Sequence, residues 1–271
     1  MNGLFDTHCH LVSDSYQDED INNILEEAKL IGVNLICNVG YDLKTSKLAV
    51  DQAFSSPDVF AAVGIHPNDV SNHQEHHLYE LEELIKTGSV CAIGEIGLDY
   101  YRNQDSSDLQ KEWFIKQIKL AKKYQLPILV HIRDAFDDAY EILKQYDVVG
   151  IMHCFSANTK TANKFIELGY YISFSGILTF ENAKDLQQVA KDIPLNKIVL
   201  ETDAPYLTPV PYRGTKNYPK NIIFTAKKLA SLKKISLNDV IITTTNNAKR
   251  ILGINLKCKI KKDTYIKNKL C

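Results

Sequence analysis

The sequence lacks the features that mark membrane-bound, secreted or strongly basic proteins. No apolar run approaches the roughly 20 residues that a transmembrane helix needs. The N-terminus has no basic segment followed by an apolar one, so a signal peptide is not expected. With 32 Lys and Arg against 33 Asp and Glu, the chain has no overall positive field that would draw it onto nucleic acid. We therefore expect a soluble, cytoplasmic protein without a membrane partner; a monomer is compatible with the sequence.

Cysteine is scarce as well, and none of the six residues forms a C-x-x-C pair. Cys9, Cys37, Cys91 and Cys154 lie in short apolar runs that are typical of buried strands. Free thiols in a reducing compartment explain this pattern better than a disulfide framework does.

Two kinds of segment alternate along the 271 residues. Short runs rich in β-branched residues are typical of strands, whereas the segments between them place apolar residues three and four positions apart, as amphipathic helices do. Several of these intervening segments end in Gly, which favours a helix C-terminus. The eight strand-like runs are 4–11, 33–40, 59–67, 89–98, 126–134, 148–156, 170–178 and 197–205. The clearest helix-like segments are 20–32, 76–88, 110–124, 138–146, 161–169, 217–235 and 237–253.

Apolar strands that alternate with amphipathic helices predict a parallel sheet covered by helices. Eight such repeats in about 250 residues fit a single-domain α/β fold, the (β/α)₈ TIM barrel. An open doubly wound sheet is the alternative, but no glycine-rich phosphate loop follows the first predicted strand. We place the barrel at residues 1–256. The remaining segment, 257–271, is rich in Lys and is either a disordered tail or a basic arm that contacts a polyanion.

Polar residues occur where the predicted strands end. Because the active site of a barrel lies at the C-terminal face, we expect these side chains to meet over one mouth. They include five of the eight His, whereas His73, His76 and His77 precede a predicted surface helix and are expected to have surface or capping roles. The polar residues at strand ends are His8, His10, His66, Glu95, Asp99, His131, Arg133, His153 and Asp203.

Several imidazoles and carboxylates in one cavity are costly unless a cation compensates them. Imidazole with carboxylate suits Zn, Mn, Fe or Ni, and Mg where more oxygen ligands are present. Six candidate ligands exceed the need of one tetrahedral ion, so we predict two divalent ions (Mg, Mn or Zn) about 3.5–4 Å apart. The predicted ligands are His8, His10, Glu95, His131, His153 and Asp203.

Glu95 and Asp203 are the predicted catalytic residues. Glu95, on a central strand, is the best bridge between the two ions. The N-terminal histidine pair and Asp203 would hold one ion, and His131 and His153 would hold the other. Asp203 would also accept the proton of the attacking water.

Seven short motifs span residues 4 to about 253: FDTHCHL, GIHP, GEIGLDYYR, LPILVHIRDA, HCFS, LETDAPYLTP and NNAKRILG. Through these motifs, in family order, the chain resembles the TatD family of metal-dependent deoxyribonucleases within the amidohydrolase superfamily. The resemblance implies a barrel that hydrolyses DNA phosphodiester bonds with divalent cations and the same six metal ligands. It also implies a phosphate-binding or supporting role for His66, and substrate-side roles near Arg102 and Arg133.

Two positions depart from the family pattern. Ala157 follows HCFS where the family often has Gly, and Tyr218 stands where the family usually has an acidic residue. The second departure lies near the expected substrate mouth, so it bears on substrate preference more than on metal binding.

Arginine beside a metal site suits a phosphate-bearing substrate, although an ion pair with Asp134 or Asp99 is the alternative for Arg102 and Arg133. Tyr100, Tyr101 and Tyr206 either stack on bases of a frayed or single strand or pack under the barrel rim. Because the net charge is close to zero, we expect the protein to bind a DNA end or a short single strand rather than to wrap long duplex DNA. These features predict a 3′–5′ exonuclease or a deoxyribonuclease active in DNA repair.

Two other functions remain open from the sequence. An amidohydrolase that cleaves a small amide, lactone or ester would use the same scaffold, but many such enzymes have a carboxylated Lys where Glu95 stands. A barrel that has lost activity and binds a partner is the second alternative, and the presence of all six predicted ligands argues against it.

Overall fold

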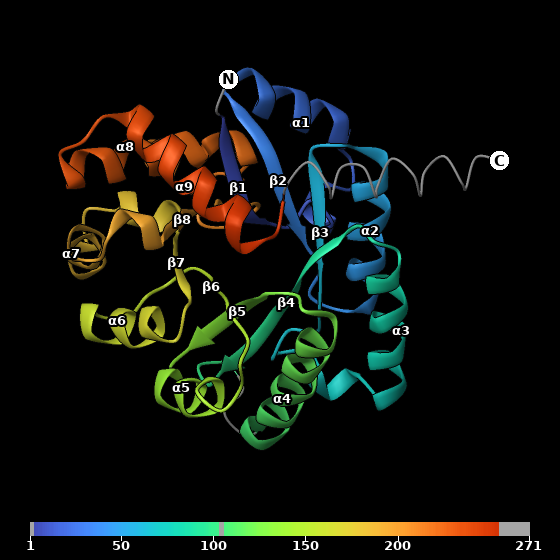
Figure 1. Ribbon diagram of the computed structural model, residues 1–271. Helices are drawn as coiled ribbons and strands as arrows, with labels where there is room; N and C mark the ends of the chain where they lie inside the picture. The colour runs from blue at the N-terminus through green and yellow to red at the C-terminus, as the bar shows by residue number, and fades with distance from the viewer. Residues whose placement is uncertain (1–2, 103–105, 255–271) are drawn as a thin grey trace.

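The computed structural model describes residues 3–102 and 106–254. Its eight strands form one parallel sheet in chain order, and each strand is followed by a helix on the outside of the barrel (Figure 1). The predicted single-domain (β/α)₈ barrel is thus confirmed. The strands are β1 (Leu4–Cys9), β2 (Val33–Val39), β3 (Val59–Val63), β4 (Val90–Asp99), β5 (Ile128–Arg133), β6 (Gly150–Met152), β7 (Tyr171–Phe174) and β8 (Ile198–Leu200).

Nine helices occur in the described part of the chain, one more than the barrel repeat requires. Gly32, Gly88 and Gly169 follow three of them with positive φ angles, as the sequence predicted for helix C-termini. No helix in this part of the chain is long and apolar enough to span a bilayer. The helices are α1 (Ile21–Leu30), α2 (Leu43–Ser55), α3 (Glu75–Lys86), α4 (Ser107–Tyr124), α5 (Phe136–Leu143), α6 (Thr159–Glu167), α7 (Lys184–Asp192), α8 (Ile222–Lys233) and α9 (Leu237–Ile251).

The proposed barrel end at residue 256 and the lysine-rich segment 257–271 lie outside the described residues. Within them, α9 is the last helix, and it packs against β1 and β8.

The interior of the barrel changes from apolar to polar along several strands. Leu129 of β5 belongs to the interior cluster, and His131 follows two positions later, on the same face. Ile151 of β6 and His153 repeat this relation. The alternation of side chains along a strand therefore aims the polar residues at the mouth. The interior cluster comprises Phe5, Leu35, Cys37, Val39, Phe60, Ala62, Cys91, Ala92, Leu129, Ile151, Tyr171, Val199, Ala248, Ile251, Leu252 and Ile254.

The seam between β1 and the segment after β8 is joined at the site itself. The Asp203 backbone N–H donates to the His8 carbonyl at 2.9 Å, and the His10 N–H donates to the Ala204 carbonyl at 2.7 Å. These two bonds fix the relative positions of three predicted ligands.

Strand β4 has the length that the sequence indicated, displaced by one residue, but Glu95 lies inside it rather than at its end. Its pairing with β5 shifts register between Ile93 and Ile96. Gly97 then passes so close to β5 that an added Cβ would lie 1.9 Å from the His131 carbonyl oxygen. Glycine at this position lets β4 carry Glu95 to the mouth beside His131.

Candidate metal centre

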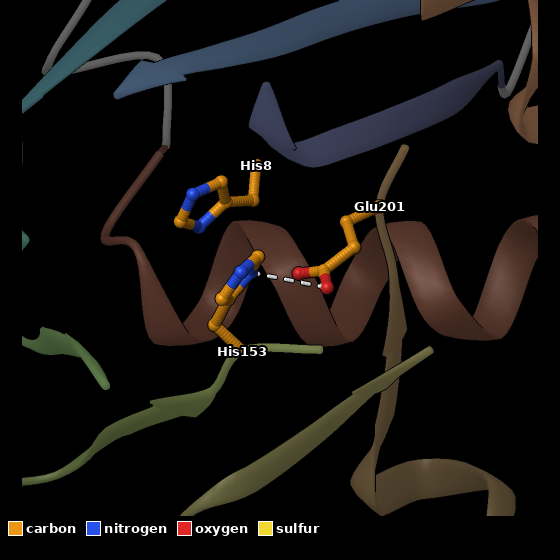
Figure 2. A group of neighbouring side chains, drawn as sticks. All are labelled: His8, His153 and Glu201. Carbon is orange, nitrogen blue, oxygen red and sulfur yellow. Dashed lines mark ion pairs between the residues drawn. The ribbon is translucent and has the colours of Figure 1, made fainter. Parts of the chain in front are cut away.

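His8 and His153 stack face to face across the barrel mouth, with ring centroids 3.6 Å apart (Figure 2). His8 lies in β1 and His153 directly follows β6, so the closed sheet brings together two distant parts of the chain. Both side chains are buried. Their rings therefore have fixed orientations before any ligand binds.

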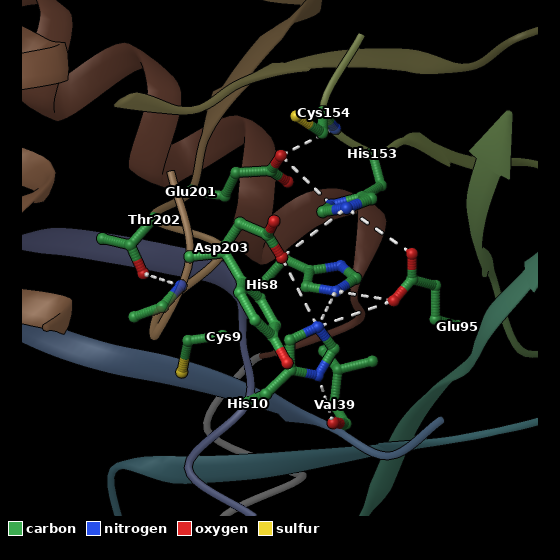
Figure 3. A network of polar contacts seen from close by, with 12 residues as sticks. His8, Cys9, His10, Val39, Glu95, His153, Cys154, Glu201, Thr202 and Asp203 are labelled. Carbon is green, nitrogen blue, oxygen red and sulfur yellow. Dashed lines mark hydrogen bonds and ion pairs between the residues drawn. The ribbon is translucent and has the colours of Figure 1, made fainter. Parts of the chain in front are cut away.

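The Glu95 carboxylate faces the imidazole rings of His8, His10 and His153 (Figure 3). Its Oε2 atom is 3.3 Å from His8 Nε2 and 3.5 Å from His10 Nε2. Its Oε1 atom is 2.9 Å from His131 Nδ1 and 3.5 Å from His153 Nε2. The two oxygens thus face different groups of nitrogens, as those of a carboxylate shared between two ions would.

The Asp203 carboxylate lies near one imidazole from each of the two groups that face Glu95. Its Oδ1 atom lies 3.4 Å from His10 Nε2 and 3.7 Å from His153 Nε2. The residue has a left-handed backbone conformation, with φ of 56°, which is uncommon for a non-glycine residue. All six residues predicted as metal ligands are therefore brought together at one point.

The donor set fits divalent cations. His8 Nε2 and His10 Nε2 are 3.2 Å apart. Two nitrogens bound to one tetrahedral ion at about 2.0–2.1 Å would be roughly 3.3 Å apart, so little movement is needed. Imidazoles around carboxylates also match the preference of transition metals and, with added water, of Mg²⁺.

Contacts on the outer side of two histidine rings leave their Nε2 atoms facing the site, where a metal ion would bind. His10 Nδ1 lies 2.8 Å from the Val39 carbonyl oxygen, which only accepts, so Nδ1 carries the proton and the Nε2 lone pair faces the site. His153 Nδ1 forms an ion pair with Glu201 Oε1 at 3.1 Å (Figure 2). This contact likewise leaves His153 Nε2 for the site.

Glu201 is a functional residue that the sequence analysis missed. It is fully buried and accepts hydrogen bonds from the Cys154 N–H and the Ser173 hydroxyl, both at 2.6 Å. Its signal was present, because it stands two positions after the inward-facing Val199 of β8. A charged residue on the buried face of a strand needs a partner, and the partner here is His153.

Replacement of Glu201 by Gln removes the charge that orients His153. We expect this change to weaken metal affinity by roughly 10–100-fold, because outer partners of metal-binding histidines contribute about that much. Calorimetric titration with Mn²⁺ measures the change. Glu26→Gln, on the exposed side of α1, is the matched control and should bind as the unmodified protein does. Equal affinity in the two variants would show that Glu201 does not act through His153.

His66 and His131 present different atoms to the site. The Asn68 N–H donates to His66 Nδ1 at 3.1 Å, so the neutral ring carries its proton on Nε2, 3.6 Å from Glu95 Oε1. His131 Nε2 faces Asp99 Oδ2 at 3.3 Å, which leaves Nδ1 toward Glu95. In this arrangement His66 offers a hydrogen-bond donor, which suits a phosphate oxygen, whereas His131 offers a lone pair.

The charges of the site depend on one another. Burial alone would raise the pKa of Glu95, but the imidazoles of His153, His66 and His8 outweigh it and hold that pKa well below its usual range. Burial would lower the pKa of His153, yet the carboxylates of Glu201 and Glu95 raise it to about 10. The metal-free site therefore holds protons where ions would bind.

Metal affinity should consequently depend on pH. The raised pKa of His153 means that its ring is protonated at neutral pH without metal, and an ion must displace that proton. We expect affinity to rise between about pH 6 and pH 9, by roughly tenfold per unit for each proton released. Titration calorimetry in buffers of different ionisation enthalpy counts these protons. Binding that is independent of both pH and buffer would contradict the expectation.

The predicted substrate-side residues lie around the mouth but are less enclosed. The Arg133 guanidinium stacks on the Tyr101 ring, 3.7 Å from its centroid, and Tyr101 is 65 % exposed. The Arg102 side chain is exposed, and its backbone N–H donates to Asp99. Stacking on Tyr101 is thus the observed contact of Arg133, where the sequence left phosphate binding and an ion pair open.

The three tyrosines near the mouth divide into two groups. The Tyr100 hydroxyl donates to Asp138 at 2.7 Å and its ring packs against the core, as the packing alternative predicted. Tyr101 is exposed, and Tyr206 is 53 % exposed with its ring edge toward His10. Only Tyr101 and Tyr206 are therefore placed to contact a ligand.

The loop that carries Tyr218 is tied to the segment after β8. Asn217 Nδ2 donates to the Thr202 carbonyl at 3.0 Å, next to Asp203. The Tyr218 hydroxyl donates to Glu19 at 3.2 Å, and its ring lies beside Tyr16. Ala157, the other departure from the family pattern, packs against the core.

Comparison with known proteins decides the family. The family model described as TatD related DNase matches residues 5–253. The chain belongs to this family. The TatD resemblance and the site geometry agree, since every motif that carried the resemblance contributes to the mouth or packs beneath it.

Individual relatives are similar to this chain over nearly its whole length. The chain is 41 % identical to the uncharacterized metal-dependent hydrolase YabD of Bacillus subtilis, over 93 % of this chain and all of that protein. It is 35 % identical to the uncharacterized metal-dependent hydrolase YcfH of Escherichia coli K12, over 93 % of this chain and 96 % of that protein. The crystal structure of the TatD homologue YjjV from Escherichia coli superposes with a TM-score of 0.88 at 28 % identity, over 93 % of this chain and 98 % of that chain. The chain is accordingly a metal-dependent hydrolase of the TatD family.

Proposed function

We propose that the protein hydrolyses phosphodiester bonds of DNA with two divalent ions, which Mg²⁺, Mn²⁺ or Zn²⁺ would provide. The observation that carries the proposal is the division of the Glu95 carboxylate between two groups of nitrogens. His8, His10 and Asp203 would hold one ion, and His131 and His153 the other. The bound ions would acidify a water and neutralise charge on the phosphoryl group.

The residues of the chain supply the remaining functions. Burial would raise the pKa of Asp203, but the neighbouring His10 and His153 lower it, so the carboxylate is ionised and able to accept a proton. The His66 Nε2–H would donate to a phosphate oxygen at the edge of the site. Arg133 and Arg102 would hold the phosphates next to the scissile one.

A strand end or a short single strand is the substrate that best suits this mouth. Two arginines and two exposed tyrosines surround the site, and the net charge of the chain is only -1. Stacking on Tyr101 or Tyr206 requires a base that is unpaired. These features support 3′–5′ exonuclease or repair-type cleavage over binding of long duplex DNA.

An end-labelled oligonucleotide tests this function. Single-stranded, duplex and abasic duplex substrates are incubated with the protein and Mg²⁺ or Mn²⁺, with and without EDTA. We expect products that shorten stepwise from the 3′ end of the single strand, or cuts at the abasic site, and no cleavage in EDTA or with His131→Ala. If small amides or lactones are turned over while every DNA substrate stays intact, the amidohydrolase alternative is correct.

Loss of the Arg133 charge should affect substrate binding more than the chemical step. Arg133→Met is expected to raise KM for a single strand by roughly tenfold, since a hydrogen bond to a charged group contributes about 1.5–3 kcal/mol. Arg250→Met, on the exposed surface of α9, is the control. Steady-state kinetics with both variants measure the effect. An unchanged KM in Arg133→Met would show that Arg133 does not bind the substrate.

We also propose that the protein works in the cytoplasm. The described cysteines Cys9, Cys37, Cys91 and Cys154 are free, and the first three are buried. Unpaired thiols of this kind support a reducing compartment.

A further inference from the structure

A second group of histidines lies outside the mouth, at the start of α3. His73 ends the preceding 3₁₀ turn, and His76, His77 and Glu80 belong to the first turns of the helix. Residues three and four positions apart share one side of a helix, so these side chains converge. We refer to His73, His76, His77 and Glu80 as the α3 cluster.

Three side chains of the α3 cluster converge. One ligand atom each from His76, His77 and Glu80 lies within 4.8 Å of the others. The ring centroids of His76 and His77 are 4.1 Å apart. His73 lies beside them, with its Nδ1 atom within hydrogen-bond distance of His77 Nδ1, at 3.0 Å.

The structural roles of these residues leave donor atoms unused. His77 Nδ1 accepts the Gln74 N–H in a capping box, which confirms the predicted capping role but occupies one nitrogen only. Lys47 binds Glu80 through Oε2 at 2.8 Å, whereas Glu80 Oε1 faces His76 Nε2 at 4.0 Å. Since the His76 side chain is largely exposed, it can turn toward an ion without disturbing the core.

No residue of the α3 cluster is part of the Glu95 site.

We propose that the α3 cluster is a second metal site, which binds Zn²⁺, Ni²⁺ or Cu²⁺ and discriminates against Mg²⁺ and Ca²⁺. His76, His77 and Glu80 offer two imidazoles and one carboxylate oxygen, which these transition metals prefer, whereas Mg²⁺ and Ca²⁺ require mostly oxygen. The site is reached directly from solvent, so the bound ion exchanges without passage through the barrel mouth. Water would complete the coordination of the ion.

Equilibrium dialysis against Zn²⁺ tests the α3 cluster independently of the DNA-cleavage proposal. The full-length protein is compared with the double variant His76→Gln/Glu80→Gln and with the control Glu83→Gln, which changes an exposed Glu of the same helix that pairs only with Lys86. We expect the double variant to bind one Zn²⁺ fewer, or to bind it at least roughly tenfold more weakly, since loss of a ligand costs no less than loss of an outer partner. The control should bind as the parent does.

The position of the bound Zn²⁺ in a crystal is the second measurement. Crystals soaked in Zn²⁺ should show an anomalous peak between His76, His77 and Glu80 that is absent from crystals of the double variant. Activity with Mg²⁺ and the melting temperature should be the same in the parent and in both variants, because the substituted side chains lie on the surface. Equal Zn²⁺ stoichiometry and affinity in parent and double variant, or no anomalous peak at the α3 cluster, would overturn the proposal.

Discussion

Glu95→Gln should abolish the bound metal and the hydrolytic activity together. The carboxylate faces both groups of imidazoles, so a neutral amide removes the shared anionic ligand of both predicted ions. Metal ions contribute several kcal/mol of transition-state stabilisation, which corresponds to a rate loss of roughly 10³-fold or more. Elemental analysis after dialysis and the turnover of a labelled oligonucleotide measure the two effects on the same sample.

The control for Glu95→Gln is Glu26→Gln on the surface of α1, which should keep both metal and rate. Circular dichroism of both variants shows whether the barrel still folds. The bridging role of Glu95 is wrong if the Gln variant folds, keeps two equivalents of metal and turns over substrate at the parental rate.

Asp203→Asn should remove the base, and in saturating metal the amide oxygen should still serve as a neutral ligand. An amide oxygen still reaches His10 and His153 but accepts no proton from the attacking water. Since a positioned general base contributes roughly 10²–10⁴-fold, kcat should fall by that amount. The dependence of kcat on pH should also lose the limb that reports ionisation of the base.

Asp134→Asn is a matched control for Asp203→Asn. Asp134 is exposed near the mouth, and its φ of 55° is nearly the same as the 56° of Asp203, so both positions accept Asn equally well. We expect no change in kcat for the control. Equal rates for the two variants in saturating metal would exclude Asp203 as the base.

The fold and the convergence of the site were predictable because both follow from local patterns. Apolar strands that alternate with amphipathic helices leave few parallel architectures. Polar residues such as His131 and His153 continue the inward face of apolar strands, so the period of two fixes their direction as well as their position. Membership of the TatD related DNase family agrees with what these patterns indicate.

What the sequence did not predict depends on contacts between distant residues. The sequence showed Glu201 as a charged residue on a buried strand face, but its partner His153 follows β6, and β7 separates β6 from β8 in the sheet, so only the folded barrel reveals their contact. Glu95 was placed at a strand end because the sequence does not show that β4 continues past it to Asp99, paired with β5 after a register shift between Ile93 and Ile96. Tyr100 and Tyr101 are adjacent in sequence, yet only the packing of Tyr100 against the core separates their roles.

Diffraction from crystals grown with Mn²⁺, recorded near the manganese absorption edge, tests the central claim most directly. The account predicts two anomalous peaks about 3.5–4 Å apart on either side of the Glu95 carboxylate. One would be bound by His8, His10 and Asp203, and the other by His131 and His153. A single peak that Glu95 does not touch, or no peak within coordinating distance of these residues at saturating Mn²⁺, would contradict it.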